Sequence, residues 1–141
     1  MRVYLSAGYG RRDEMRTAKE HLEDLGFDVT STWMDSVEPC DMDGTDPRAR
    51  STAESDLLEI DCCEALILFT DTGLTSFGRG GRWVELGYAL GLDDVLVCLV
   101  GPLQNIFCAL ADRRFETLDE AANFLASLDS RLYHDDTEGN T

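Results

Sequence analysis

The sequence predicts an α/β fold: a Rossmann-like (flavodoxin-like) parallel sheet of four to five strands with helices on both faces. Two uninterrupted apolar runs, 65–70 (ALILFT) and 95–100 (VLVCLV), are typical of parallel strands that helices cover on both sides. Segments with helical spacing of apolar residues alternate with these runs and with two further strand-like segments. Such an alternation of strand and helix produces a parallel sheet.

Each element is predicted from its own pattern. Helices are expected where apolar residues recur at helical spacing, and strands where they alternate or run together. Gly26 stands where a left-handed residue commonly ends a helix. The Thr-x-x-Glu pattern at Thr117 is a capping box, which indicates the start of the last helix. The expected strands are 2–5, 27–33, 65–70 and 95–100, and the expected helices are 13–25, 49–61, 82–92 and 117–128.

The 141 residues have the length of a single domain, which we expect over residues 1–130. The remaining segment, 131–141, carries acids without periodicity and is expected to be a disordered tail. No apolar stretch approaches the roughly 18 residues of a membrane span, and the first residues lack the apolar core of a signal peptide. We therefore expect a protein of the cytoplasm that does not bind membranes.

The cysteines favour a reduced protein. There are five of them, an odd number, and none forms a Cys-x-x-Cys pair. Cys62, Cys63 and Cys98 are interpreted as small buried hydrophobic residues. Redox chemistry at the adjacent pair Cys62 and Cys63 is an alternative. The two histidines are isolated and no cysteines are paired, so neither a metal site nor a cofactor is expected.

The charge of the chain limits its partners. With 28 acidic and 12 basic residues, the net charge is -16. A negative field of this size repels a phosphate backbone, so a nucleic-acid polymer is not an expected partner. The few arginines nevertheless gather into clusters, which suggests a site for a small anion. These clusters are Arg11 with Arg12, Arg79 with Arg82, and Arg113 with Arg114.

Two loops are candidates for the binding site, 6–12 and 70–82, because ligands of open parallel sheets bind where the strand order reverses. The second loop is rich in glycine and leads into a helix, an arrangement that presents backbone N–H groups to an anion. Glu85 lies about one turn into that helix, where the dipole and the arginines are expected to keep its carboxylate ionised. An ionised carboxylate can act as a nucleophile toward a sugar carbon. The alternative is a glycine-rich turn followed by an ordinary helix glutamate, and spacing alone favours that alternative.

Three segments, taken in order, resemble the nucleoside 2-deoxyribosyltransferase family: 4–8 (YLSAG), 56–57 (DL) and 81–90 (GRWVELGYAL). The similarity spans most of residues 2–108. Members of this family cleave the N-glycosidic bond between a base and a (deoxy)ribose, and either transfer the sugar to another base or hydrolyse it. The resemblance implies that Glu85 is the nucleophile and that Tyr4 lies beside it. It also implies that Asp56 handles the base or assists proton transfer.

One departure from the family pattern concerns Arg79. Transferases of the family commonly have an aspartate at this place, six residues before the nucleophile. The segment that contains Arg11 and Arg12 looks more like the nucleotide hydrolases of the same superfamily, in which an arginine after the first strand meets a 5'-phosphate. With Ser6 and Gly8, these arginines are candidates for a phosphate pocket. The alternative is that they are surface charges of the first helix, paired with Asp13 or Glu14.

Two further residues have both a functional and a structural interpretation. Trp33 is a candidate for stacking on a base, and equally a core tryptophan. Asn105 belongs to a Gln-Asn-Ile-Phe segment that is similar to the Asn-Val-Phe segment of many family members. Because enzymes of this family are commonly oligomers, the resemblance implies a homodimer or higher homo-oligomer in which Asn105 approaches a neighbouring site.

The sequence therefore predicts an enzyme that cleaves the N-glycosidic bond of a nucleoside or nucleoside 5'-monophosphate, by hydrolysis or by transfer. Glu85, Asp56 and Tyr4 are its expected catalytic residues. The alternative is a binding module that holds a nucleotide-derived ligand in the same pocket without cleaving it. The expected substrate-binding residues are Ser6, Gly8, Arg11, Arg12, Trp33, Arg79, Gly81, Arg82 and Asn105.

Overall fold

The computed structural model describes residues 1–36, 44–71 and 80–129, so the predicted tail and Arg79 lie outside the described residues. The strands are β1 (Arg2–Ser6), β2 (Asp28–Val29), β3 (Ala65–Phe69), β4 (Leu96–Val100) and β5 (Arg113–Phe115). The α-helices are α1 (Arg12–Asp24), α2 (Ala49–Asp61), α3 (Gly81–Leu90) and α4 (Leu118–Leu128). Three 3-10 helices are η1 (Tyr9–Arg11), η2 (Trp33–Asp35) and η4 (Ile106–Leu110).

The five strands form one parallel sheet in the order β2-β1-β3-β4-β5. This order confirms the predicted Rossmann-like α/β class, and it reverses between β1 and β3. Tyr4 pairs with Leu66 and Ser6 with Leu68, so β1 and β3 end at the same edge of the sheet. A crevice beyond that edge is the usual ligand site of such sheets.

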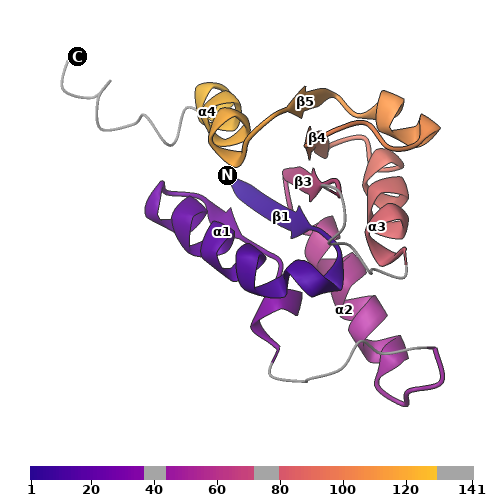
Figure 1. The fold of residues 1–141 in the computed structure, drawn as a ribbon. Coiled ribbons are helices and arrows are strands. Elements are labelled where there is room, and N and C mark those ends of the chain that lie inside the picture. The colour runs from indigo at the N-terminus through magenta and orange to yellow at the C-terminus, as the bar shows by residue number, and fades with distance from the viewer. Residues whose placement is uncertain (37–43, 72–79, 130–141) are drawn as a thin grey trace.

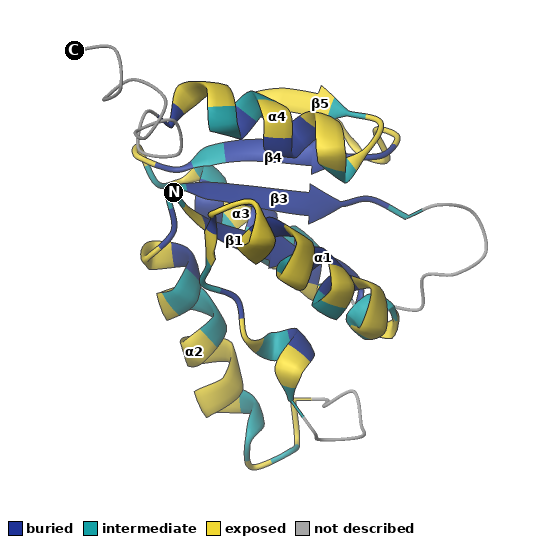
Figure 2. Cartoon of the chain, turned by 90° about the vertical axis from the view of Figure 1, so that its left-hand side faces the viewer, coloured by how far each residue is buried: buried dark blue, intermediate teal, exposed yellow. Residues whose placement is uncertain are grey.

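Helices cover both faces of the sheet, and the alternation of side chains along each strand defines the two faces. Val3 and Leu5 of β1 share a core with residues of α1 and α4. Tyr4 points to the other face, where its core neighbours include Leu86 of α3 and Ile60 of α2. Figure 1 shows α1 and α3 on opposite sides of the strands, and Figure 2 shows β3 and β4 as buried elements between exposed helix surfaces.

Most predicted elements lie where their patterns placed them. The predicted helix 49–61 is confirmed as α2, and Gly26 has the left-handed φ of 99° expected after α1. The cap of α4 is confirmed, because the Thr117 hydroxyl accepts a hydrogen bond of 3.2 Å from the backbone N–H of Glu120. These elements depend on local signals, which the sequence shows directly.

The second strand is shorter than predicted, and the position of the fifth strand was not predicted. After Val29 the Ser31 hydroxyl accepts a hydrogen bond of 3.0 Å from the backbone N–H of Leu5, so a side chain replaces the strand ladder. The fifth strand has only three residues, of which Arg113 and Arg114 are exposed. A short, charged segment at the sheet edge lacks the apolar pattern by which strands are found.

The described cysteines are free thiols. Cys63 and Cys98 are buried as predicted, but Cys62, at the end of α2, is exposed, so its predicted burial is wrong. Burial raises the pKa of Cys63 and of Cys98 to about 12, which keeps both thiols protonated and poorly nucleophilic. Within the described ranges, no helix is long and apolar enough to cross a membrane, and no cluster of side chains is arranged to hold a metal ion.

Candidate active site

The centre of the candidate site is the carboxylate of Glu85, which β1 and α3 position together. Tyr4 and Ser6 are two residues apart on β1, so their side chains point to the face that α3 covers. The Tyr4 hydroxyl donates to Oε2 of Glu85 at 2.5 Å, and the Ser6 hydroxyl donates to Oε1 at 2.7 Å. Each carboxylate oxygen therefore has its own hydroxyl donor.

The surroundings of Glu85 act on its acidity in opposite directions. Burial raises the pKa of the Glu85 carboxyl, the hydrogen bonds from Tyr4 and Ser6 lower it, and the charge of Glu59 raises it again. The net direction is upward, because the desolvation of a buried carboxylate is the largest effect. Among the described residues, the groups that favour the charged form of Glu85 are these two hydroxyls and not an arginine; Arg79 lies outside the described residues.

Tyr4 is suited to remain a hydrogen-bond donor. Its side chain is fully buried. Burial, followed by the charge of Glu85, raises the pKa of the Tyr4 phenol above its usual value. A phenol that stays protonated stabilises the carboxylate without competing with it for a negative charge.

Asp56 is a second carboxyl group near Glu85, and it comes from α2. It is half-buried, and no hydroxyl donor contributes to its acidity. Burial, then the charges of Glu85 and Glu59, raise the pKa of Asp56 to about 7. Since two hydroxyls favour the charged form of Glu85 and none favours that of Asp56, a proton shared between these groups resides on Asp56.

Trp33, Tyr9 and Arg12 form a row of neighbouring side chains near the C-terminal end of β1. The Trp33 indole N–H donates to the backbone oxygen of Leu5 at 2.8 Å, and the half-buried ring packs against both cores. The Tyr9 ring lies 6.4 Å from the Trp33 ring, and the Arg12 guanidinium lies 5.2 Å from the Tyr9 ring. Trp33 is therefore partly a core residue, as its structural interpretation predicts.

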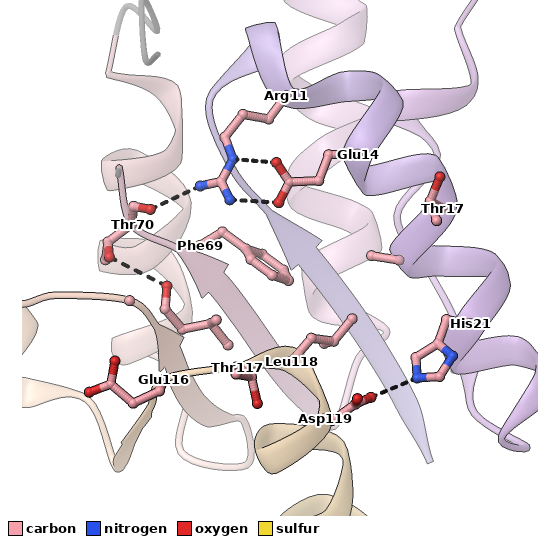
Figure 3. A pocket seen from close by; sticks show the side chains of 13 residues that line it. Arg11, Glu14, Thr17, His21, Phe69, Thr70, Glu116, Thr117, Leu118 and Asp119 are labelled. Atoms are coloured by element: carbon pink, nitrogen blue, oxygen red, sulfur yellow. Dashed lines mark hydrogen bonds and ion pairs between the residues drawn. The ribbon is translucent and has the colours of Figure 1, made fainter. Parts of the chain in front are cut away.

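Arg11 lies on the other face of the sheet. Its guanidinium donates to the Thr70 backbone oxygen at 2.9 Å and to both oxygens of Glu14 at 3.0 and 2.6 Å (Figure 3). It also lies 5.5 Å from the centre of the Phe69 ring, which belongs to the core under α1 and α4. The structure does not bring Arg11 to Glu85, and its pairing with Glu14 is the predicted structural alternative.

Arg11 lines a groove with a volume of about 530 Å³ between α1 and the start of α4. Figure 3 shows the side chains that line it. A hydrogen bond of 2.8 Å joins His21 of α1 to Asp119 of α4 across this groove. Part of its lining is apolar and includes Phe69 and Leu118. The groove is separate from the carboxylate centre, because Phe69 and Tyr4 point to opposite faces of the sheet.

Arg82 occupies the first turn of α3, three residues before Glu85. This helix begins at Gly81, after Gly80 with a left-handed φ of 94°. The Arg82 side chain is 7% exposed and pairs with Asp71, the second residue after β3. Among the described residues, its buried Nε and Nη1 atoms have no hydrogen-bond partner, and neither has Oδ1 of Asp71. A buried guanidinium with two nitrogens that make no hydrogen bond can donate to an anion.

Two further predicted residues have local structural roles. The Gly8 carbonyl accepts a hydrogen bond of 2.9 Å from the Arg11 backbone N–H, which closes the η1 turn. The Asn105 side chain caps η4, since its oxygen accepts from the N–H groups of Phe107 and Cys108 at 3.0 and 3.3 Å. The described contacts of Gly8 and Asn105 do not join them to Glu85.

Sequence reasoning missed two residues that support the site. Glu59 lies one helical turn after Asp56, and this i, i+3 spacing of acids was a signal that could have found it. Gln104 exchanges two hydrogen bonds, of 2.9 and 2.8 Å, with the backbone of Asp71. No sequence pattern predicts the contact between Gln104 and Asp71, because these residues lie in two loops and are 33 residues apart.

Two solved structures resemble the chain over most of its length. One is a 2-deoxyribosyltransferase from the psychrotolerant bacterium Bacillus psychrosaccharolyticus, with 20% identity and a TM-score of 0.66 over 87% of this chain and 91% of that one. The chain has the 2-deoxyribosyltransferase fold. The other is the CMP N-glycosidase BcmB of Clostridium botulinum, which also shares this fold, with 15% identity and a TM-score of 0.53 over 89% of this chain and 98% of that one.

Neither a family model nor a curated protein sequence matches the chain. The two structural neighbours are nevertheless of the kinds that the sequence motifs resemble, a deoxyribosyltransferase and a nucleotide N-glycosidase. Within this 2-deoxyribosyltransferase fold, the carboxylate of Glu85 lies on α3 and its donors lie on β1.

Proposed function

We propose that the protein cleaves the N-glycosidic bond of a nucleoside or nucleoside 5'-monophosphate, with Glu85 as nucleophile. The observation that supports this most directly is the pair of hydroxyls that hold both oxygens of Glu85 at 2.5 and 2.7 Å, beside the second carboxyl of Asp56. Substitution at a sugar carbon uses one ionised carboxyl group as nucleophile and one protonated carboxyl group as general acid. The two structural neighbours, a deoxyribosyltransferase and a CMP N-glycosidase, add support.

The reaction has two steps. In the first, a Glu85 oxygen forms a bond to the anomeric carbon, and the C–N bond breaks with its electron pair remaining on the base. Asp56 gives its proton to the departing base and becomes a carboxylate. In the second step water attacks the anomeric carbon, the ester bond to Glu85 breaks, and Asp56 recovers a proton from the water. A second base in place of water would give transfer.

We favour a nucleoside 5'-monophosphate as substrate and hydrolysis as the reaction. Arg82 supports the choice of a phosphorylated substrate, since among the described residues its buried Nε and Nη1 atoms have no hydrogen-bond partner and it lies three residues before Glu85. A phosphate that replaced the Asp71 carboxylate beside Arg82 would accept from Nη2 and from one of those two nitrogens. Arg12, with Tyr9 and Trp33, is the second candidate for contacts to the substrate. Arg79, Gly81 and Ser6 remain proposed members of the pocket.

The test is chromatography of nucleosides and nucleoside 5'-monophosphates after incubation with the protein, with and without an acceptor base. Release of free base supports hydrolysis, and exchange of the base supports transfer. Glu85→Gln should abolish both, whereas Glu54→Gln, on the exposed surface of α2, should not. Full turnover by Glu85→Gln would refute the mechanism. Tight binding without turnover, unaffected by Glu85→Gln, would instead favour the binding module.

We also propose that the protein forms a homo-oligomer in the cytoplasm. Large apolar side chains are exposed in and just before η4, and they surround the cap residue Asn105. They are Leu103, Ile106, Phe107 and Leu110. Exposed apolar residues that cluster in this way are typical of a subunit interface. Sedimentation analysis of Ile106→Asp against the unchanged protein tests the interface, and the free thiols agree with a reducing compartment.

A further inference from the structure

Glu59 holds a position that the reaction outlined above does not use. It lies on α2 one turn after Asp56, and its carboxylate reaches the segment between β2 and η2. Oε1 accepts a hydrogen bond of 3.0 Å from the Thr32 backbone N–H, and Oε2 accepts one of 2.5 Å from the Thr32 hydroxyl. The Thr30 hydroxyl adds a bond of 3.0 Å to the Glu59 backbone oxygen.

We propose that Glu59 is a positioning residue of the candidate active site, which ties the helix of Asp56 to the segment of Trp33 and holds a fixed negative charge beside Asp56. This role rests on the proposed function, and Glu59 itself takes no part in the reaction. Its first part follows from the bonds to Thr32, because Trp33 is the next residue along the chain. The Trp33 indole in turn donates to the Leu5 backbone oxygen, between Tyr4 and Ser6.

The second part concerns charge. Within the part of the chain that the structure describes, the charged groups that act on Asp56 are Glu85 from α3 and Glu59 from its own helix, and both are negative. From β1, the neighbour is the neutral phenol of Tyr4, whose own pKa is raised first by burial and then by the charges of Glu85, Asp56 and Glu59. A general acid must be protonated when the substrate binds. A negative charge one turn away favours that protonated form.

A neutral side chain of the same shape can keep both bonds of the tether, although each bond is then weaker. A glutamine amide oxygen accepts from the Thr32 N–H, and the Thr32 hydroxyl can rotate to accept from the amide NH₂. The tether therefore does not need a charged side chain. The effect that only a carboxylate adds at this position is its negative charge near Asp56. Glu59→Gln separates the two effects because it removes the charge and keeps the bonds.

The experiment measures the titration of the Asp56 carboxyl by ¹³C NMR, together with the pH dependence of base release. In Glu59→Gln the Asp56 midpoint should fall by roughly half a pH unit or more, and the basic limb of the activity profile should move to lower pH by the same amount. Thr32→Val keeps the charge and weakens the tether, so its titration should stay closer to that of the unchanged protein. Glu54→Gln on the same helix is the matched control, with no expected shift.

An unchanged Asp56 midpoint in Glu59→Gln would overturn the inference, and so would an equal shift in Glu54→Gln. A merely structural role predicts that Glu59→Gln behaves like the unchanged protein at every pH. The NMR titration needs no substrate, so it decides the role of Glu59 even where no base is released. Absence of turnover by the unchanged protein would refute the proposed function alone.

Discussion

The Tyr4 hydroxyl and the Glu85 carboxylate, 81 residues apart in the sequence, are joined by a hydrogen bond of 2.5 Å. The bond joins strand β1 to the helix α3 that covers it, and the Ser6 hydroxyl, also on β1, donates to the other oxygen of the carboxylate. The two hydroxyls counteract the upward effect of burial on the pKa of Glu85. The fraction of Glu85 that is ionised at a given pH therefore depends on β1.

Removal of the phenol hydroxyl in Tyr4→Phe should raise the pKa of Glu85 further, because a bond to the charged form is lost. The acidic limb of the pH–activity profile should then move to higher pH. Turnover at neutral pH should fall roughly 10- to 100-fold, as a hydrogen bond to a charged group contributes about 1.5–3 kcal/mol. Steady-state kinetics across pH measure both effects. Tyr88→Phe is the control, since this hydroxyl contacts Asp61 instead, and an acidic limb that stays in place would contradict the assigned role of Tyr4.

Loss of the acid in Asp56→Asn should remove the basic limb of the profile. The pKa of Asp56 is about 7 in the protein against an ordinary value of 3.8, so its protonated form is present below about pH 7 and is lost above it. The rate should fall on the order of 10²–10⁴-fold, the usual contribution of general acid catalysis. Substrates whose leaving group needs no proton should be much less affected. Equal losses for good and poor leaving groups would argue against Asp56 as the acid.

Gly101 should not tolerate a side chain. Its φ is +115°, and an added Cβ would lie 2.3 Å from the Thr70 hydroxyl oxygen. Gly101→Ala should therefore lower the free energy of unfolding by about 2 kcal/mol or more, through both strain and the clash. Urea denaturation measures this change. Gly10→Ala is the matched control, because nothing lies within 4 Å of its Cβ position, and a comparable loss in both variants would contradict the explanation.

The pair of the buried Arg82 and the half-buried Asp71 should show strong coupling. Arg82→Met leaves the Asp71 carboxylate without its partner, at a cost of about 3 kcal/mol in the free energy of unfolding. Adding Asp71→Asn to that variant should recover part of the loss, since the uncompensated charge is then gone. A double-mutant cycle by urea denaturation measures the coupling. Strictly additive losses would mean that the two side chains do not stabilise one another.

The sequence predicted the centre of the site better than its surroundings. The apolar runs of β3 and β4 and the capping residue Thr117 depend on local patterns, and the structure confirms them. The short motifs also picked out Tyr4 and Glu85, which are in contact. What the motifs could not supply was the direction of a long side chain. Arg11 and Arg12 are adjacent, yet the first reaches Thr70 and Glu14, whereas the second packs on Tyr9.

The pKa of Glu85 could not be predicted from the sequence either. The expected effect of nearby arginines on Glu85 depended on their sequence proximity, but the pKa follows from burial and from hydroxyls on a distant strand. The charge of Glu59, on a third element, α2, raises the pKa of Glu85, and this effect also depends on the folded packing. Such effects depend on distances in the folded molecule, so they become predictable only once the packing of β1, α2 and α3 is known.

The 81 and 79 residues that separate Glu85 from its two donors also bear on how the protein comes into being. Contacts across so long a stretch of chain form slowly, because the intervening loop must close first. A nascent or half-folded chain exposes Glu85 as an ordinary glutamate in water, without its two hydroxyl donors. On the proposed function, the chain would react with a nucleotide only after β1 and α3 have docked, and the return of activity during refolding should follow that docking rather than the initial collapse.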